Sequence, residues 1–133
     1  MSSLLKDFEK FISRLRVESL ALATLMIVLT YESSAPLWIL PATFILFDVC
    51  IIGYLVNSRV GAAAYNFIHD FTIPTVLIAL GIVANSEWIS ILGFTWTFHV
   101  AIDRSLGFGL KHSHSFKHTH LGEIGKTEKK KRP

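Results

Sequence analysis

Two aspartates and two histidines interrupt the apolar stretches of this 133-residue sequence: Asp48, His69, His99 and Asp103. An ionisable side chain inside an apolar membrane segment is costly unless it is paired or hydrated, so such residues are candidates for function. Imidazole and carboxylate ligands together suit Zn²⁺, Mn²⁺ or Fe²⁺, and both groups also act as general acids and bases. We therefore take these four residues as candidate catalytic residues and as candidate ligands of a divalent metal ion.

Basic residues follow these candidates toward the end of the chain. Arg104 and Lys111 could hold a phosphate or a lipid headgroup, or they could simply reach the headgroup level by snorkelling. Histidines then recur at His112, His114, His118 and His120. A surface cluster of this kind is usually a solvated, pH-sensitive patch, so we do not place the first three in a site.

The composition indicates which class of protein carries these residues. Hydrophobic residues make up 51% of the chain and charged residues only 17%, against about 25% charged in an ordinary soluble domain. The charges gather in the first sixteen residues, a middle loop and the tail after Asp103. This pattern predicts a single membrane domain over residues 1–121 and a basic tail over 122–133. The basic residues border apolar stretches, so we expect anionic lipid headgroups, and not nucleic acid, as partners.

The apolar stretches predict an all-α fold, a bundle of four transmembrane helices. We place the spans at about 17–34, 37–56, 63–84 and 88–106, each close to the roughly 20 residues that cross about 30 Å of hydrocarbon. Residues 3–16 repeat apolar side chains at helical spacing among lysines and arginines, which predicts a short amphipathic helix at the membrane interface. Pro41 and Pro74 lie inside spans and are expected to kink them.

Charge and aromatic residues predict the orientation. The loops at residues 32–36 and 85–87 contain no Lys or Arg, whereas the N-terminal segment, the loop with Arg59 and the tail from Arg104 do. The positive-inside rule then puts both termini in the cytoplasm, as in a multi-pass protein of the cell membrane. Tyr31, Trp38 and Trp88 fall near the expected outer interface, where amphipathic rings prefer to lie.

These spans place the candidate residues at similar depths. At 1.5 Å per residue, Asp48 lies about 12 Å from the cytoplasmic end of its span, and His69 and His99 lie about 10 Å from theirs. His99 and Asp103 are four residues apart and therefore project from one helical face. The common depth predicts one shared site in the cytoplasmic half of the bundle. The alternative is that each polar group only hydrogen-bonds helices together.

Two stretches of the chain resemble a known family. They are DVCIIGYLVNSRVGAAAYNFIHDFTIP, from Asp48 to Pro74, and HVAIDRSLGFGLKHSHSFKHTHLG, from His99 to Gly122. The order GYL, GA, YN, H and P, followed by HxxxDRxxGxGLK and THLG, resembles the domain-of-unknown-function 4260 family of small bacterial integral membrane proteins. The resemblance implies a four-helix membrane protein without an assigned reaction. Because its motif includes THLG, His120 becomes a candidate tail ligand that folds back toward the site.

Three hypotheses of function stay open at this point. The first is a metal-dependent enzyme that acts on a lipid or isoprenoid headgroup from the cytoplasmic leaflet, with Arg104 and Lys111 holding phosphate. The second is a proton or ion transporter, which would need a homo-oligomer because four helices are few for a pathway. The third is a scaffold whose polar groups only lock the helices. The chain has no GxSxG, Walker or Rossmann glycine motif, which argues against a serine hydrolase, an ATPase or a dehydrogenase.

Overall fold

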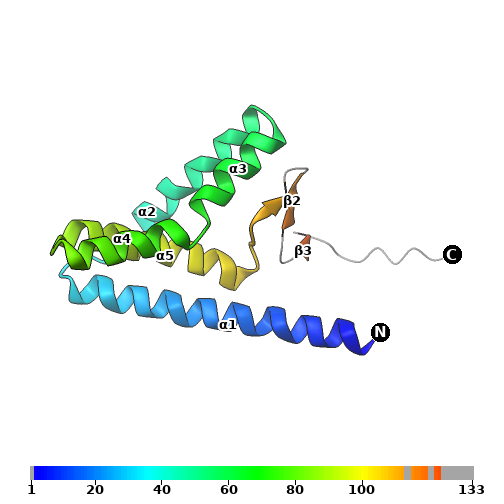
Figure 1. Cartoon of the computed structure of the whole chain (residues 1–133), viewed down its shortest axis with the longest axis horizontal. Coiled ribbons are helices and arrows are strands. Elements are labelled where there is room, and N and C mark those ends of the chain that lie inside the picture. Colours follow the sequence, from blue (N-terminus) through cyan, green and yellow to red (C-terminus); the bar gives the residue numbers. More distant parts are fainter. Residues whose placement is uncertain (1, 113–114, 120–121, 124–133) are drawn as a thin grey trace.

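The computed structural model describes residues 2–112, 115–119 and 122–123 of the chain (Figure 1). Its helices are α1 (Ser3–Glu32), α2 (Ile39–Asp48), the 3-10 helix η1 (Val49–Leu55), α3 (Ser58–Ile68), α4 (Thr72–Val83) and α5 (Glu87–Leu106). Three short antiparallel strands follow in the order β1 (Lys111–His112), β2 (Ser115–Thr119) and β3 (Gly122–Glu123). The main body therefore consists of four helical segments, which are α1, α2 with η1, α3 with α4, and α5. This confirms the predicted all-α class.

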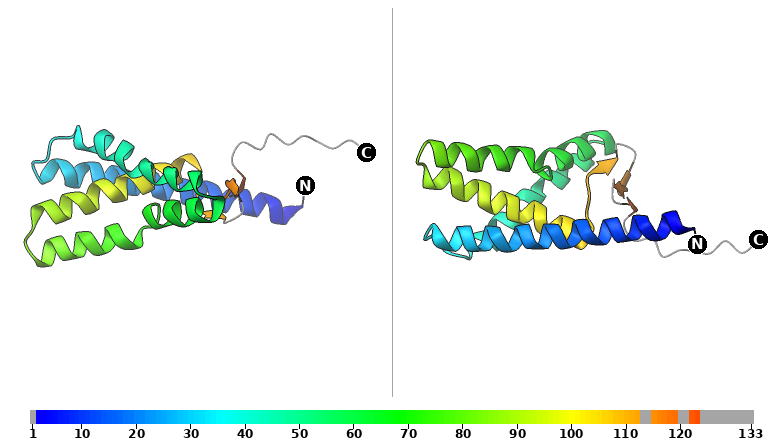
Figure 2. Two further views of the ribbon diagram at one scale, coloured as in Figure 1. Left: turned by 90° about the horizontal axis from the view of Figure 1, so that it is seen from above. Right: turned by 60° about the horizontal axis from the view of Figure 1, so that its bottom comes forward.

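The four segments run back and forth. Figure 2 shows the turn after α1 and the turn between α4 and α5 at one end of the molecule, and the N-terminus and the start of α3 toward the other. α5 packs against α1, α2 and α4, so it is the central helix. η1 and α3, residues 49–68, pack on each other and form an arm that leaves this body (Figure 1). The small sheet, which the sequence did not predict, lies against α3.

α1 differs from the prediction. The expected interfacial helix and the expected first span form one unbroken helix of 30 residues. Nothing interrupts it because the segment contains neither Pro nor Gly before Pro36. Arg16 donates a hydrogen bond from Nε to the backbone oxygen of Ser105, at 2.7 Å, near the end of α5. The part of α1 before Arg16 extends past that end (Figure 1), so an amphipathic N-terminal part is present but is not a separate helix.

The two prolines that the sequence placed inside spans do not kink helices, which corrects the prediction. Pro41 is the third residue of α2 and Pro74 the third residue of α4. Proline is tolerated in the first turn of a helix because the N–H that it lacks has no intrahelical partner there. Pro74 therefore marks a new helix. The predicted third span is broken at residues 69–71, between α3 and α4, and the side chain of Asp70 accepts the Thr72 backbone N–H at 2.6 Å to start α4.

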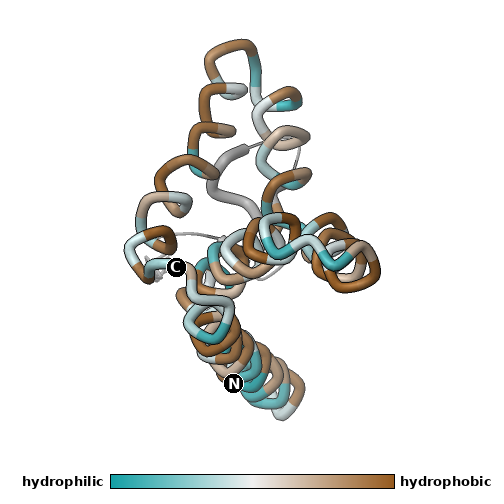
Figure 3. Tube along the Cα trace, turned by 90° about the vertical axis from the view of Figure 1, so that its left-hand side faces the viewer, coloured by the Kyte–Doolittle hydropathy of each residue, from teal (hydrophilic) through white to brown (hydrophobic). Residues whose placement is uncertain are grey.

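By length and composition, one helical stretch of the described residues could cross a membrane, Ser58–Val83, which joins α3 and α4. Ile39–Leu55 is apolar but shorter. In Figure 3 hydrophobic residues dominate α2, η1 and α4, whereas hydrophilic residues recur along α1 toward the N-terminus. Charged residues lower the apolar character of the other two segments, with Glu18 and Glu32 in α1 and Asp103 and Arg104 in α5.

α4 and α5 cross at two glycines. A Cβ atom built on Gly93 would lie 2.9 Å from the backbone nitrogen of Ile78 and 3.0 Å from the backbone oxygen of Pro74, and one on Gly81 would lie 2.5 Å from the backbone nitrogen of Ser90. Backbone atoms cannot move aside as a flexible side chain can. Small residues at these positions therefore allow the close approach that sets His99 and Asp103 of α5 against the neighbouring helices.

We expect Gly93→Leu to lower the free energy of unfolding by about 1–3 kcal/mol, the usual effect of overpacking a close contact. Thermal unfolding of the detergent-solubilised protein measures the effect. Ala79→Leu adds a comparable side chain to the exposed face of α4 and should leave the transition within about 0.5 kcal/mol of its original stability. Equal transitions for the two variants would contradict the close crossing.

Candidate metal centre

Three helical segments supply the four candidate residues. Asp48 is the last residue of α2, where the chain passes into η1, and His69 caps the end of α3. His99 and Asp103 lie one turn apart on the unbroken helix α5. The structure brings all four together, with one ligand atom from each residue and all four atoms within 4.8 Å of one another. Asp48 and His69 therefore lie where a helix ends, and His99 and Asp103 lie within a continuous helix.

The distances within the Asp/His cluster (Asp48, His69, His99 and Asp103) are close to those of a coordination shell. Nε2 of His69 lies 2.9 Å from Nε2 of His99 and 2.9 Å from Oδ2 of Asp103. Oδ1 of Asp48 lies 3.6 Å from Nε2 of His69 and 3.5 Å from Nε2 of His99. Nε2 of His99 lies 3.8 Å from Oδ2 of Asp103. With bonds of about 2.0–2.1 Å, ligands at the corners of a tetrahedron are about 3.3–3.4 Å apart. The observed distances scatter around that value.

The surroundings of His69 fix which nitrogen faces the cluster. Nδ1 of His69 lies 3.0 Å from the backbone oxygen of Tyr65. A carbonyl oxygen only accepts, so Nδ1 carries a proton and donates it, and in the neutral imidazole the lone pair is then on Nε2, which faces His99 and Asp103. The Tyr65 ring also stacks on the imidazole, with centroids 3.7 Å apart and an angle of 5° between the planes. A histidine that donates its outer nitrogen to a backbone carbonyl is typical of metal ligands.

His99 is held by aromatic rings. Its imidazole lies 4.3 Å from the ring centroid of Phe44 and 5.5 Å from that of Phe47. Its Nδ1 is buried and has no hydrogen-bond partner among the described residues. His99 is fully buried and His69 is 2% exposed, whereas the side chain of Asp48 is 39% exposed. The cluster is therefore enclosed except on the side of Asp48.

Other residues that the sequence analysis named have different surroundings. Arg104 donates from Nη2 to the backbone oxygen of His69 at 3.0 Å, and its guanidinium carbon lies 5.6 Å from the ring centroid of Phe71. Lys111 begins β1, but its side chain lies outside the described part of the structure, as does all of His120. The predicted phosphate-binding role of Arg104 and Lys111 and the tail-ligand role of His120 stay predictions.

Sequence reasoning missed the aromatic residues Phe44, Phe47 and Trp96 around the cluster, although helical spacing alone puts Tyr65 on the same face as His69. Phe44, Phe47 and Trp96 contact the buried histidines or the backbone beside them, and Tyr65 holds His69. A helical signal for three of them is present in the sequence, because Phe44 precedes Asp48 by four residues, Tyr65 precedes His69 by four and Trp96 precedes His99 by three. Phe47 has no such signal, since only the packing of α2 on α5 brings it to His99.

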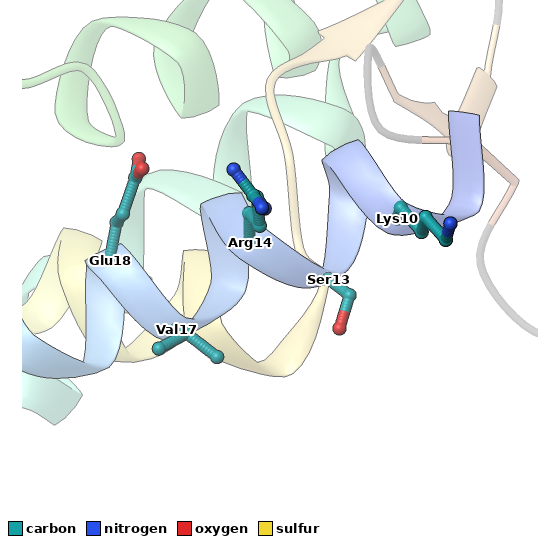
Figure 4. A pocket seen from close by; sticks show the side chains of 5 residues that line it. All are labelled: Lys10, Ser13, Arg14, Val17 and Glu18. Carbon is teal, nitrogen blue, oxygen red and sulfur yellow. The ribbon is translucent and has the colours of Figure 1, made fainter. Parts of the chain in front are cut away.

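A surface hollow beside α1 is a further concave feature near charged residues. Lys10, Ser13, Arg14, Val17 and Glu18 line it. Figure 4 shows that Arg14 and Glu18 project from one side of α1, and Ser13 and Val17 from the other. No residue of the Asp/His cluster lines this hollow, so the chemistry of the cluster does not extend to it.

Comparison with known families adds to this geometry. The model of a family described as "Domain of unknown function (DUF4260)" matches residues 13–124. The chain belongs to the DUF4260 family. All four residues of the Asp/His cluster lie inside the part of the chain that matches DUF4260, and so does Arg104. No curated protein and no solved structure gives a match to the chain.

Proposed function

We propose that this DUF4260 chain is a multi-pass integral membrane protein that binds one divalent metal ion between Asp48, His69, His99 and Asp103. We further propose that the ion serves a reaction on a lipid or isoprenoid headgroup. The observation that carries the proposal is the convergence of four ligand atoms within 4.8 Å of one another. Their mixed nitrogen and oxygen chemistry suits Zn²⁺, Mn²⁺ or Fe²⁺.

The hydrogen-bond chemistry of the cluster favours a cation. Because Nδ1 of His69 donates to Tyr65, a neutral His69 presents an acceptor nitrogen to another imidazole nitrogen and to a carboxylate, each 2.9 Å away. Nε2 of His99 can meet this acceptor with its own N–H, but the carboxylate of Asp103 cannot, so the lone pair of His69 Nε2 and Oδ2 of Asp103 repel each other unless a cation or a proton lies between them. A divalent ion would offset both carboxylate charges and satisfy both imidazole lone pairs. Groups that only join helices would instead hydrogen-bond separately to backbone or hydroxyl partners.

The distribution of polar and apolar side chains supports a membrane location. Large hydrophobic side chains lie on the outside, such as Leu55 at 85% and Val83 at 81% exposed, whereas His99 and Thr30 are fully buried. Surfaces this apolar are unusual on soluble monomers. Helix hydroxyls also bond within their own helix, as Thr30 does to the Met26 backbone oxygen at 2.7 Å, which is how polar groups are satisfied in lipid.

Four crossings with both termini in the cytoplasm are part of the proposal. The back-and-forth course of the four segments allows it (Figure 2), and the Lys and Arg residues of the loops favour it. The ends of α1 and α5 that Arg16 and Ser105 join would then lie at the cytoplasmic side. The Asp/His cluster would lie in the half of the bundle that faces those ends.

The proposed reaction follows from the ligand set and from access. When bound at such residues, a divalent ion polarises a phosphoryl oxygen and lowers the pKa of a coordinated water. Asp48 is the member of the cluster with the most exposed side chain, so a headgroup would reach the site past Asp48. Lys111, close in the chain to the end of α5, would contact the phosphate of that headgroup.

A second candidate function, a proton relay, is favoured by one contact. The two imidazole nitrogens, 2.9 Å apart, could share a proton and pass it between Asp48 and Asp103. Such a relay works without a metal ion. Metal content therefore separates the two candidates.

The test is metal analysis of the protein purified in detergent without a histidine tag. We expect about one equivalent of Zn, Mn or Fe per chain in the natural protein, because each of the four residues offers one ligand atom to a single ion. His69→Ala and His99→Ala should each leave less than about a tenth of that amount, because each removes one ligand. His118→Ala, in β2, is the matched control and should keep the full content. His120→Ala tests whether the tail supplies a further ligand.

Equal metal content in the natural chain and in both cluster variants would overturn the proposed site. A natural chain without metal, which also takes up none on incubation with Zn²⁺, Mn²⁺ or Fe²⁺, would favour the relay or the scaffold.

A further inference from the structure

The break between α3 and α4 leaves carbonyl groups that no helix satisfies. The last carbonyls of any helix lack intrahelical donors, and inside a bundle each must find another partner. α3 ends at Ile68, His69 follows as its cap, and α4 begins only at Thr72. His69 therefore belongs to the Asp/His cluster and, at the same time, to the break between α3 and α4.

α5 supplies the missing donors. Nε1 of Trp96 donates to the backbone oxygen of Ile68 at 2.6 Å, and Nη2 of Arg104 donates to that of His69 at 3.0 Å. The guanidinium of Arg104 also lies over the ring of Phe71, on the other side of the break. Two side chains of one helix thus hold both ends of the break.

The same face of α5 carries ligands and donors. Trp96, His99, Asp103 and Arg104 follow the i, i+3, i+7, i+8 pattern that lines one side of a helix. His99 and Asp103 reach into the cluster, while Trp96 and Arg104 hold the backbone next to the third ligand. One face of α5 therefore both carries His99 and holds the backbone at His69, so it sets the position of His69 relative to His99.

We infer that Arg104 is a positioning residue. Its hydrogen bond to the His69 carbonyl and its contact with Phe71 lock the break between α3 and α4 and so direct Nε2 of His69 at the other members of the cluster. Its effect on metal affinity rests on the proposed metal site, but its effect on the break does not. A role limited to phosphate capture would leave both the break and the metal affinity unchanged.

Cys50 provides a readout that needs no metal. It is the single cysteine of the chain, it is half-buried, and its Sγ lies 3.9 Å from Nδ1 of His69. Release of His69 would uncover this thiol. The rate at which the metal-free, detergent-solubilised protein reacts with a small maleimide therefore reports whether the break is locked.

Arg104→Gln should raise the rate of Cys50 labelling about 10- to 100-fold, as expected when the charged donor to a buried carbonyl is replaced by a shorter, neutral amide that does not reach it. It should also weaken Co²⁺ binding about 10- to 100-fold, as the loss of outer partners of metal ligands does. Absorption spectra of the Co²⁺-loaded protein should change in shape, because the direction of one ligand changes. Arg59→Gln removes an exposed arginine of α3 and is the matched control, expected to change neither quantity.

Arg104→Lys keeps the charge and one donor but not the planar group over Phe71, so it should fall between the natural chain and Arg104→Gln in both measurements. If Arg104→Gln does not fold, Arg104→Lys provides the same test with both measurements. If the Arg104 variants label Cys50 at the same rate as the natural chain and bind Co²⁺ with the same affinity, the inference is overturned while the metal site is not. Faster labelling in the variants of a chain that binds no Co²⁺ would leave the inference standing and overturn the metal site.

Discussion

Asp103→Asn is expected to weaken the affinity for Zn²⁺ or Mn²⁺ by more than about 100-fold, because losing a ligand should exceed the 10- to 100-fold effect of losing an outer partner. His69→Ala should have a similar effect. The double variant should be little worse than either single one, since Nε2 of His69 and Oδ2 of Asp103 lie 2.9 Å apart and would serve the same ion. Isothermal titration of the metal-free protein with each ion measures these affinities.

Asp70→Asn is the matched control for this experiment. Asp70 is also an acid beside His69, but its side chain accepts the backbone N–H of Thr72, and asparagine accepts the same bond. We expect natural affinity in this variant. Thermal unfolding gives an independent reading, because a bound ion stabilises the folded state by about 2.7 kcal/mol at a free concentration 100 times Kd. A chelator should therefore lower the transition of the natural chain and not that of Asp103→Asn. Fully additive effects of His69→Ala and Asp103→Asn would contradict a shared ion.

The second large effect concerns topology, where labelling should be all or none. In a Cys50→Ser background, cysteine at Ser33 or Ser86 should react with a membrane-impermeant thiol reagent added to intact cells. Cysteine at Ser58 should not. Ser33 follows α1 and Ser86 precedes α5, at the end of the molecule that the charge pattern places outside, whereas Ser58 begins α3 beside Arg59.

Permeabilised cells provide the control, since there Ser58→Cys must react as fully as the other two variants. This shows that the residue is accessible once the membrane is open. Labelling of Ser58→Cys in intact cells, or equal protection of all three positions, would exclude the four-crossing arrangement.

Local sequence signals were enough to predict the helical body. The last predicted segment, 88–106, agrees closely with Glu87–Leu106, whereas the prediction missed the continuity of α1 from Ser3 and the break between α3 and α4. The family was likewise predictable, because its motifs are contiguous stretches of residues. The helical spacing of His99 and Asp103 required only the 3.6-residue turn.

Local signals were misleading where the same residues are compatible with two different structures. Pro74 kinks a helix if it lies in the interior and begins one if it lies in the first turn, and the structure shows the second case. From Ser3 to Glu32 the sequence changes once, from amphipathic to apolar, and contains no helix-breaking residue. This change in character was interpreted as a boundary between two helices, although the helix is continuous. Hydropathy describes the environment of a helix, whereas backbone hydrogen bonding decides where the helix ends.

The sequence by itself determined which residue types enter the cluster, and the spacing of His99 and Asp103 along α5 follows from residue count alone. Only the tertiary structure decided that Asp48, His69, His99 and Asp103 meet, since rotation of each helix about its axis depends on packing, here on Gly81 and Gly93 between α4 and α5. The tertiary structure also decided the surroundings of Arg104. Its hydrogen bond to the carbonyl of His69 exists because the chain breaks there and α5 passes beside the break.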